Sequence, residues 1–133
     1  MGQAMITIDA EAGLETVTVT GRVNVNNFLA VTNDENFGTQ RKKLWDLTKS
    51  DLSDITTDQI ITVLEHFKEL DDINKAEAAA ILVDNPANEV LVKLFEAISR
   101  DVLLRKIPIY IATTRDDALR WLNTMVEDHK KAS

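Results

Sequence analysis

The segment that follows Asp46 contains the side chains best suited to a switch or a partner contact. An apolar run ends at Asp46, and a stretch rich in Asp, Ser, Thr and Lys separates it from the next apolar period. A phosphate on Thr56 or Thr57 would lie at the start of the following helix, where free backbone N–H groups favour anions. Neighbouring acids would repel that phosphate. The switch or partner-binding candidates are Asp46, Ser53, Asp54, Thr56 and Thr57.

A structural role for the same residues is the simpler interpretation. Ser, Thr and Asp are the common residues of turns and helix caps. Thr56 and Gln59 have the spacing of a capping box, in which each side chain binds the backbone N–H of the other residue. The cap-and-turn interpretation is therefore favoured over a switch, and the segment remains the best candidate surface.

A cation site is a further alternative for the acids of this region. Asp46, Asp54 and Asp84 could converge at the ends of strands, and hard cations require several oxygen ligands. Receiver domains also place a basic group at the end of the last strand, where only Arg115 is available here. We expect neither a metal nor a cofactor.

Enzyme chemistry has little support in the sequence. His66 and His129 have no partnered nucleophile, and no general base is visible for the serines. The chain contains no cysteine, which excludes thiolate catalysis and disulfides, and no glycine-rich phosphate loop. We therefore expect a protein that is not an enzyme.

Hydrophobic periodicity predicts the elements that position these residues. Alternation in residues 5–9 and 15–20 predicts an antiparallel hairpin. Apolar residues at helical spacing predict a short helix at 25–32, and after it strands alternate with helices. The expected strands are 42–47, 77–84 and 107–113, and the expected helices are 57–70, 86–104 and one from 115 onward. Residues 1–4 and 128–133 are expected to be frayed.

The predicted order is β-β-α-β-α-β-α-β-α over 133 residues. Such an order is typical of a single α/β domain with a mostly parallel sheet, here with a leading antiparallel hairpin.

The helix expected at 86–104 is apolar around much of its circumference. Its inward stripe is Leu91, Leu94, Phe95, Ile98 and Val102. Such width is compatible with burial under neighbouring segments, with a homodimer interface or with a lined apolar pocket. The apolar-ligand or interface candidates are the residues that flank this stripe, together with a tryptophan of the last helix: Val90, Val92, Leu103, Leu104 and Trp121.

Charge and composition exclude several partners. The formal net charge is −7, and the longest basic cluster covers only residues 41–43, so we expect no binding to nucleic acid or to an anionic membrane surface. No apolar run approaches the roughly 20 residues that span a bilayer. No secretory signal is visible. A cytoplasmic location is expected.

Three stretches carry a family resemblance: "LWDLTKSDLSDIT", "AAAILVDNPANEVLVKLFEAI" and "IPIYIATTRDDALRWL". They resemble the SpoIIAA-like proteins, whose fold is shared by STAS domains and anti-sigma-factor antagonists and is likened to lipid-carrying CRAL-TRIO domains. The resemblance covers residues 6–122, about nine tenths of the chain, and implies the same fold.

The resemblance implies a non-catalytic regulatory or protein-interaction domain. Its contact surface would be the loop at 48–57 and the flank of the following helix. In the antagonists an acid ends the strand, and a second acid about eight residues later precedes a phosphorylated serine. Asp46 and Asp54 match these acids, but Ile55 stands in place of the serine and the glycine of the motif is missing. The alternative that the resemblance implies is a carrier or sensor of a small apolar ligand such as a lipid.

Overall fold

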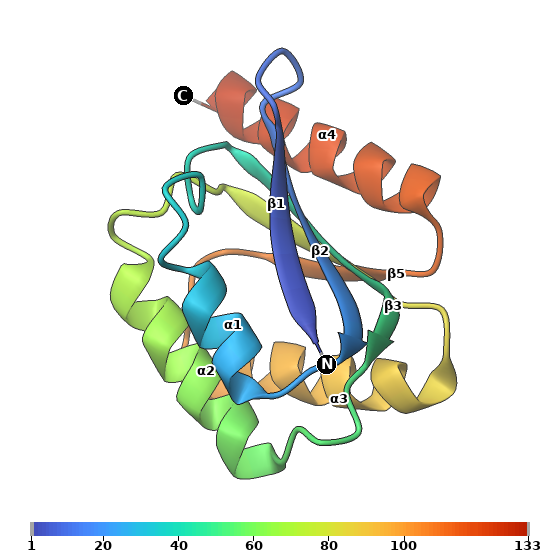
Figure 1. Cartoon of the computed structure of the whole chain (residues 1–133). Helices are drawn as coiled ribbons and strands as arrows, with labels where there is room; N and C mark the ends of the chain where they lie inside the picture. Colours follow the sequence, from blue (N-terminus) through green and yellow to red (C-terminus); the bar gives the residue numbers. More distant parts are fainter. Residues whose placement is uncertain (1, 133) are drawn as a thin grey trace.

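Five strands form one sheet in the order β1-β2-β3-β4-β5 in the computed structural model, which describes residues 2–132 and their side chains as far as residue 127 (Figure 1). β1 is antiparallel to β2, and the other neighbouring strands are parallel. The predicted hairpin and mostly parallel sheet are confirmed. The strands are β1 (Gln3–Asp9), β2 (Leu14–Arg22), β3 (Lys42–Asp51), β4 (Ala78–Leu82) and β5 (Ile109–Ala112).

The helices form a layer on each side of the sheet. They are α1 (Val25–Val31), α2 (Thr57–Leu70), α3 (Pro86–Ala97) with the π-helical turn η1 (Ile98–Val102), and α4 (Arg115–Ala132). α1, α2 and α3 cover one face, and α4 covers the other (Figure 1). Each of the first three helices connects two neighbouring parallel strands, and connections of one hand place their helices on one face. α4 follows the last strand and is free of that constraint.

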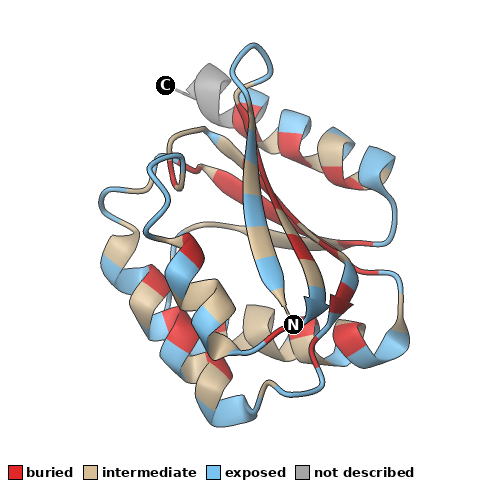
Figure 2. Cartoon of the chain, in the orientation of Figure 1, coloured by how far each residue is buried: buried red, intermediate tan, exposed pale blue. Residues whose placement is uncertain are grey.

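Two apolar cores result, one on each face of the sheet. Alternate residues of a strand point to opposite faces, so Trp45 and Leu47 face α1–α3 whereas Leu44 faces α4. All five residues of β4 are buried, as expected for a strand covered on both faces. Figure 2 shows the buried stripes of the helices turned toward the sheet.

β3 is longer than the sequence predicts. The expected strand ends at residue 47, but β3 continues to Asp51 because Lys49, Ser50 and Asp51 pair with the end of β2. The register shifts between Thr18 and Thr20 where this second stretch of pairing begins. The predicted loop at 48–57 is therefore wrong for residues 48–51, which are strand.

The inward face of α3 is rotated from the predicted stripe. Val92 is 3% exposed, and Val102, predicted to be inward, is 68% exposed. Asn88 is drawn into the interior because its side chain accepts from the Leu52 N–H and donates to the Ser50 carbonyl oxygen. Further along, the wider turn of η1 buries Ser99 and turns Val102 to the surface.

The ends of the chain differ from the prediction where the structure describes them. Gln3 and Ala4, which were expected to be frayed, pair with Thr20 and Val19. The backbone of α4 continues to Ala132. Met1 and Ser133 lie outside the described residues, as do the side chains from 128 onward.

Candidate functional site

An apolar cavity lies between the sheet and the helices of one face. The sheet contributes Trp45 and Leu47 from β3 and Ile81 from β4, which face this side by strand alternation. The cavity has a volume of about 70 Å3, or about 550 Å3 when the open solvent at its mouth is included. The remaining walls come from the three helices and the loop after β3: Phe28, Leu52, Ile55, Ile60, Val63, Phe67, Leu91, Val92 and Phe95.

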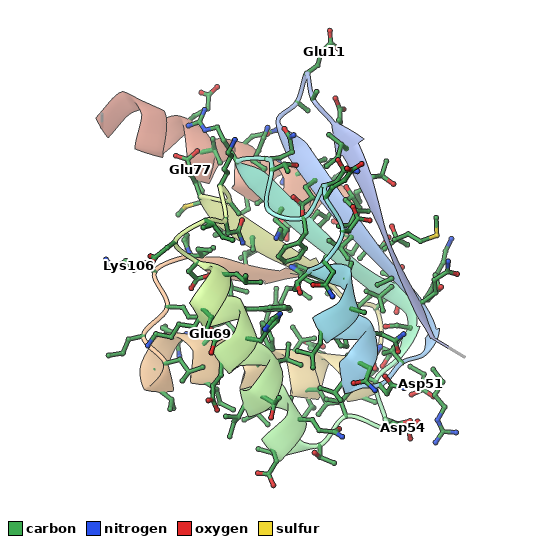
Figure 3. The ribbon with its side chains drawn as sticks, turned by 60° about the vertical axis from the view of Figure 1, so that its left-hand side comes forward. Glu11, Asp51, Asp54, Glu69, Glu77 and Lys106 are labelled. Atoms are coloured by element: carbon green, nitrogen blue, oxygen red, sulfur yellow. The ribbon has the colours of Figure 1, made fainter. Side chains whose placement is uncertain are left out.

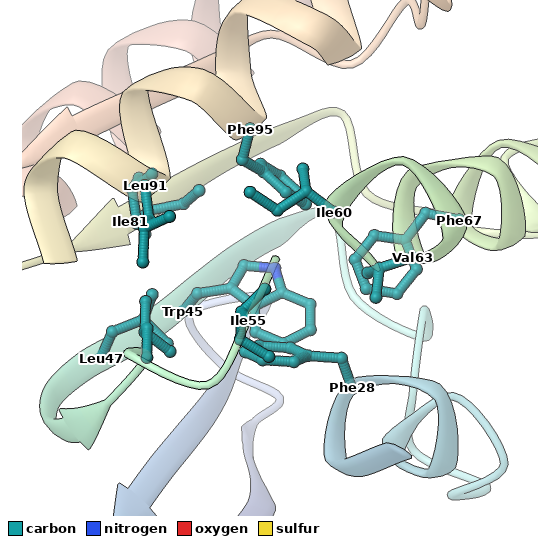
Figure 4. Close-up of a pocket in the computed structure, with 12 residues that line it drawn as sticks. Phe28, Trp45, Leu47, Ile55, Ile60, Val63, Phe67, Ile81, Leu91 and Phe95 are labelled. Carbon is teal, nitrogen blue, oxygen red and sulfur yellow. The ribbon is translucent and has the colours of Figure 1, made fainter. Parts of the chain in front are cut away.

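Aromatic rings form the centre of this cavity. The ring centroid of Trp45 lies 5.6 Å from that of Phe67 and 6.1 Å from that of Phe28, and Phe95 lies 6.3 Å from Phe67. These tilted and edge-on pairs have the spacing at which aromatic rings attract one another. Figure 4 shows Trp45 among the labelled lining residues. All of the lining side chains are aliphatic or aromatic, so the cavity can hold an apolar group and offers no acid or base.

The acidic corner after β3 is held by an ion pair that the sequence does not reveal. Arg22 donates to both carboxylate oxygens of Asp54, at 2.7 and 2.8 Å. This pairing lowers the pKa of Asp54 and raises the pKa of Arg22. Asp51 accepts from the Ser53 N–H at 2.9 Å, and that hydrogen bond lowers the pKa of Asp51. Figure 3 shows Asp51 and Asp54 at the same corner of the molecule.

Thr56 is the N-cap of α2. Its hydroxyl oxygen accepts from the Gln59 N–H at 3.3 Å, and the Gln59 side chain accepts from the Thr56 N–H at 3.0 Å. The predicted capping box is therefore present. Thr57 is the exposed first residue of α2, and Ser53 is exposed in the turn before it. The two hydroxyls nearest the helix start thus have different local roles, because only that of Thr56 is engaged in the cap.

Asp46 does not join this corner. It lies within β3 on the α4 side of the sheet, where it accepts from the Thr48 N–H at 3.0 Å and the Thr48 hydroxyl at 2.7 Å. Within the part of the chain that the structure describes, no three His, Asp or Glu side chains gather as metal ligands. The convergence of Asp46, Asp54 and Asp84 is therefore not observed.

The five apolar candidates lie in separate places. Val92 lines the cavity, whereas Val90 is 67% exposed. Leu103 and Leu104 follow η1, with Leu104 71% exposed. Trp121 stacks on Tyr110 at 5.2 Å on the opposite face of the sheet. Of these candidates, only Val92 belongs to the cavity.

Sequence reasoning missed most of the cavity wall. The wall includes Trp45 of β3 and three residues of α2 that the sequence does not single out as a site: Ile60, Val63 and Phe67. Space left between packed side chains depends on how several elements meet, so no local pattern reveals it. A second missed feature does have a local signal. Glu15 and Lys43 are charged residues at strand positions that the alternation of side chains places on the buried face of the sheet.

Comparison with known proteins supports the fold. No protein-family profile matches the sequence, and no curated protein is significantly similar to it in sequence. The chain is similar in structure to an uncharacterized protein of the DUF3478 family from Shewanella loihica PV-4, whose crystal structure has a SpoIIAA-like fold. The two superpose with a TM-score of 0.56 over 91% of this chain and 93% of that chain. The present fold is SpoIIAA-like. At 12% sequence identity the SpoIIAA-like likeness concerns the fold alone.

Among residues 2–132, none of the SpoIIAA-like domain's helices has both the length and the apolar character needed to cross a bilayer.

Proposed function

We propose that this SpoIIAA-like domain is a non-catalytic carrier or sensor of a small apolar ligand, which it binds in the cavity beneath α1, α2 and α3. The observation that carries the proposal is the wall of the cavity, which is made entirely of aliphatic and aromatic side chains from both layers. An apolar ligand in that space would replace water against apolar surface, which is favourable in proportion to the area removed from water.

The proposal is tested with the uncharged fluorescent probe N-phenyl-1-naphthylamine, after any co-purified ligand has been identified by native mass spectrometry and extracted. We expect saturable binding to the wild type. Ile55→Trp should weaken it at least tenfold, because Ile55 lines the cavity and a larger side chain there occupies ligand space. Val90→Trp is the matched control, since Val90 is exposed and outside the cavity. Absence of probe binding, or equal affinity in all three proteins, would contradict the proposal.

A protein-interaction domain in the cytoplasm is the second candidate function. It is favoured by the exposed Ser53, Asp54 and Thr57 beside the start of α2, the region through which the SpoIIAA-like resemblance implies a contact. In this function a protein partner would bind residues 51–57 and the flank of α2. Asp54→Ala should then abolish capture of that partner while leaving binding of N-phenyl-1-naphthylamine unchanged. Incorporation of phosphate at Thr56 or Thr57 would add a switch, and capture that survives Asp54→Ala would exclude this surface.

A further inference from the structure

Two opposite charges are enclosed beneath the loop that precedes β3. Glu15 and Lys43 are neighbours in the register of β2 and β3, and they are 0% and 3% exposed. Their Oε2 and Nζ atoms are 3.3 Å apart, yet neither atom makes a hydrogen bond. The other carboxylate oxygen of Glu15 is occupied, since it accepts from the Gly38 and Thr39 N–H groups at 2.8 and 3.2 Å.

Lys43 therefore has donor capacity that the protein leaves unused. Its Nζ lies 3.4 Å from the ring centroid of Phe37, a cation–π contact that replaces at most one weak hydrogen bond. Burial lowers the pKa of Lys43, with Glu15 opposing that effect. Both the ammonium and the neutral amine donate hydrogen bonds, and a buried donor without an acceptor is costly.

Lys43 lies in the wall of a second cavity next to the apolar one, with its Nζ enclosed behind that wall. This second cavity has a volume of about 30 Å3, or about 440 Å3 when the open solvent at its mouth is included, and Lys43 and Phe37 are among its lining residues. It shares with the apolar cavity the side chains of Trp45, Phe67, Ile81 and Phe95. The Lys43 Nζ is 5.9 Å from the ring centroid of Trp45. Side chains rather than backbone thus separate the two spaces, and rotamer changes of that kind are common on binding.

The other charged group of the second cavity, Arg105, is already engaged, and so is the amide oxygen of Asn74. Arg105 donates to both carboxylate oxygens of Asp71, at 3.0 and 2.9 Å. Asn74 accepts from the Ala76 N–H at 2.9 Å. Among the charged side chains of the described residues that line this cavity, Lys43 is therefore the one whose donors remain to be matched by a ligand.

The charges around Lys43 determine which kind of ligand oxygen would be accepted there. Glu15 with Lys43, and Asp71 with Arg105, are two buried or half-buried pairs of opposite sign. A ligand carboxylate would add an uncompensated negative charge to this enclosed place, which is expensive. A carbonyl oxygen accepts the same hydrogen bond without adding a charge.

We propose that the ligand is an uncharged apolar molecule with a carbonyl group, whose hydrocarbon part occupies the apolar cavity and whose carbonyl oxygen accepts a hydrogen bond from the Nζ of Lys43. This inference rests on the proposed function, which supplies the apolar site. It adds the chemical class of the ligand and the residue that selects it.

The test compares 2-octanone with octanoate by calorimetry. We expect the wild type to bind the ketone more tightly than the acid. The double variant Glu15→Gln/Lys43→Met removes the donor without leaving an unpaired buried charge, and it should bind the ketone about tenfold more weakly. Lys49→Met, at an exposed position of β3, is the control and should bind like the wild type.

A second measurement needs no variant. The carbonyl stretch of carbon-13-labelled 2-octanone, recorded by infrared difference spectroscopy on the wild-type complex, should lie below its frequency in an alkane solvent. A frequency equal to the alkane value would overturn the hydrogen bond from Lys43.

The outcomes separate this inference from the proposed function. In one outcome, the wild type and the double variant bind the ketone equally while N-phenyl-1-naphthylamine still binds. That result would exclude the role of Lys43 but would still support the apolar site. Octanoate that binds more tightly than the ketone overturns the neutral head group. If neither the ketone nor the fluorescent probe binds the wild type, both proposals fail.

Discussion

Glu15 and Lys43 show how two inward charges are tolerated in a core. Each is costly to bury alone, but at 3.3 Å their charges offset one another, and Glu15 also holds the backbone of Gly38 and Thr39. The pair thus anchors the loop before β3, and Lys43 also lines the second cavity.

Removing one member of this pair should destabilise the fold more than removing both charges. Lys43→Met leaves the carboxylate of Glu15 buried and uncompensated, so the free energy of unfolding should fall by about 3 kcal/mol. Adding Glu15→Gln should recover most of the loss, because the amide oxygen can still accept from Gly38 and Thr39. Urea unfolding of the two single variants and the double variant measures this cycle. A double variant less stable than Lys43→Met would refute the account.

Asp54 should make stability depend on acidity. Arg22 lowers the pKa of Asp54 in the folded state, so folding is favoured above the ordinary pKa of 3.8, and the contribution is lost as the pH falls through the lowered value. At about pH 6 the wild type should therefore have a higher free energy of unfolding in urea than Asp54→Asn. The two free energies should converge near pH 2. The difference should be small, because the pair is exposed and screened by salt. A difference in the free energy of unfolding that persists near pH 2 would contradict its assignment to the ionised Asp54.

The turn that follows η1 contains a strained residue. Leu104 adopts a φ of 54°, the one positive φ among the non-glycine residues described, and its side chain is 71% exposed. An L-residue in this conformation is strained by about 1–2 kcal/mol, whereas glycine adopts it freely. Glycine loses more entropy on folding, and this loss offsets part of the relieved strain. Leu104→Gly should therefore raise the free energy of unfolding by a net amount of roughly 0.5–1 kcal/mol.

Leu103 is the matched control for that change. It precedes Leu104, is half-buried, and has a φ of −89°. Leu103→Gly relieves no strain and loses packing, so thermal unfolding should occur at a lower temperature than in the wild type. Destabilisation by Leu104→Gly comparable to that by Leu103→Gly would show that the left-handed conformation is not the dominant cost.

The elements also show where sequence patterns suffice. α2 starts and ends as predicted because the Thr56–Gln59 box and its apolar stripe agree, and β4 is recognised from its uninterrupted run of apolar residues. The patterns fail where a distant segment decides. Residues 48–51 are strand because the end of β2 pairs with them, and Asn88 is buried because its amide binds the backbone after β3.

For the fold as a whole, the sequence predicts the layers but not the spaces between them. The order of elements is enough to infer a mostly parallel sheet with a leading hairpin. The apolar cavity depends instead on how far α1, α2 and α3 stand from the sheet, which is set by side chains such as Phe28 and Phe95 that meet only in the folded chain. For the same reason Trp121 and Val92, both candidates on pattern, lie on opposite faces of the sheet.

Because the walls of the cavity come from the sheet and three helices, a ligand bound there contacts most of the fold. Unfolding would dismantle the site, so binding should stabilise the whole molecule by an amount that grows with the logarithm of free ligand, about 2.7 kcal/mol at a hundred times the dissociation constant. Thermal unfolding of the wild type in increasing 2-octanone should therefore shift steadily upward. Ile55→Trp should flatten this dependence, and Val90→Trp should retain it. An equal shift in all three proteins would place the ligand outside the cavity.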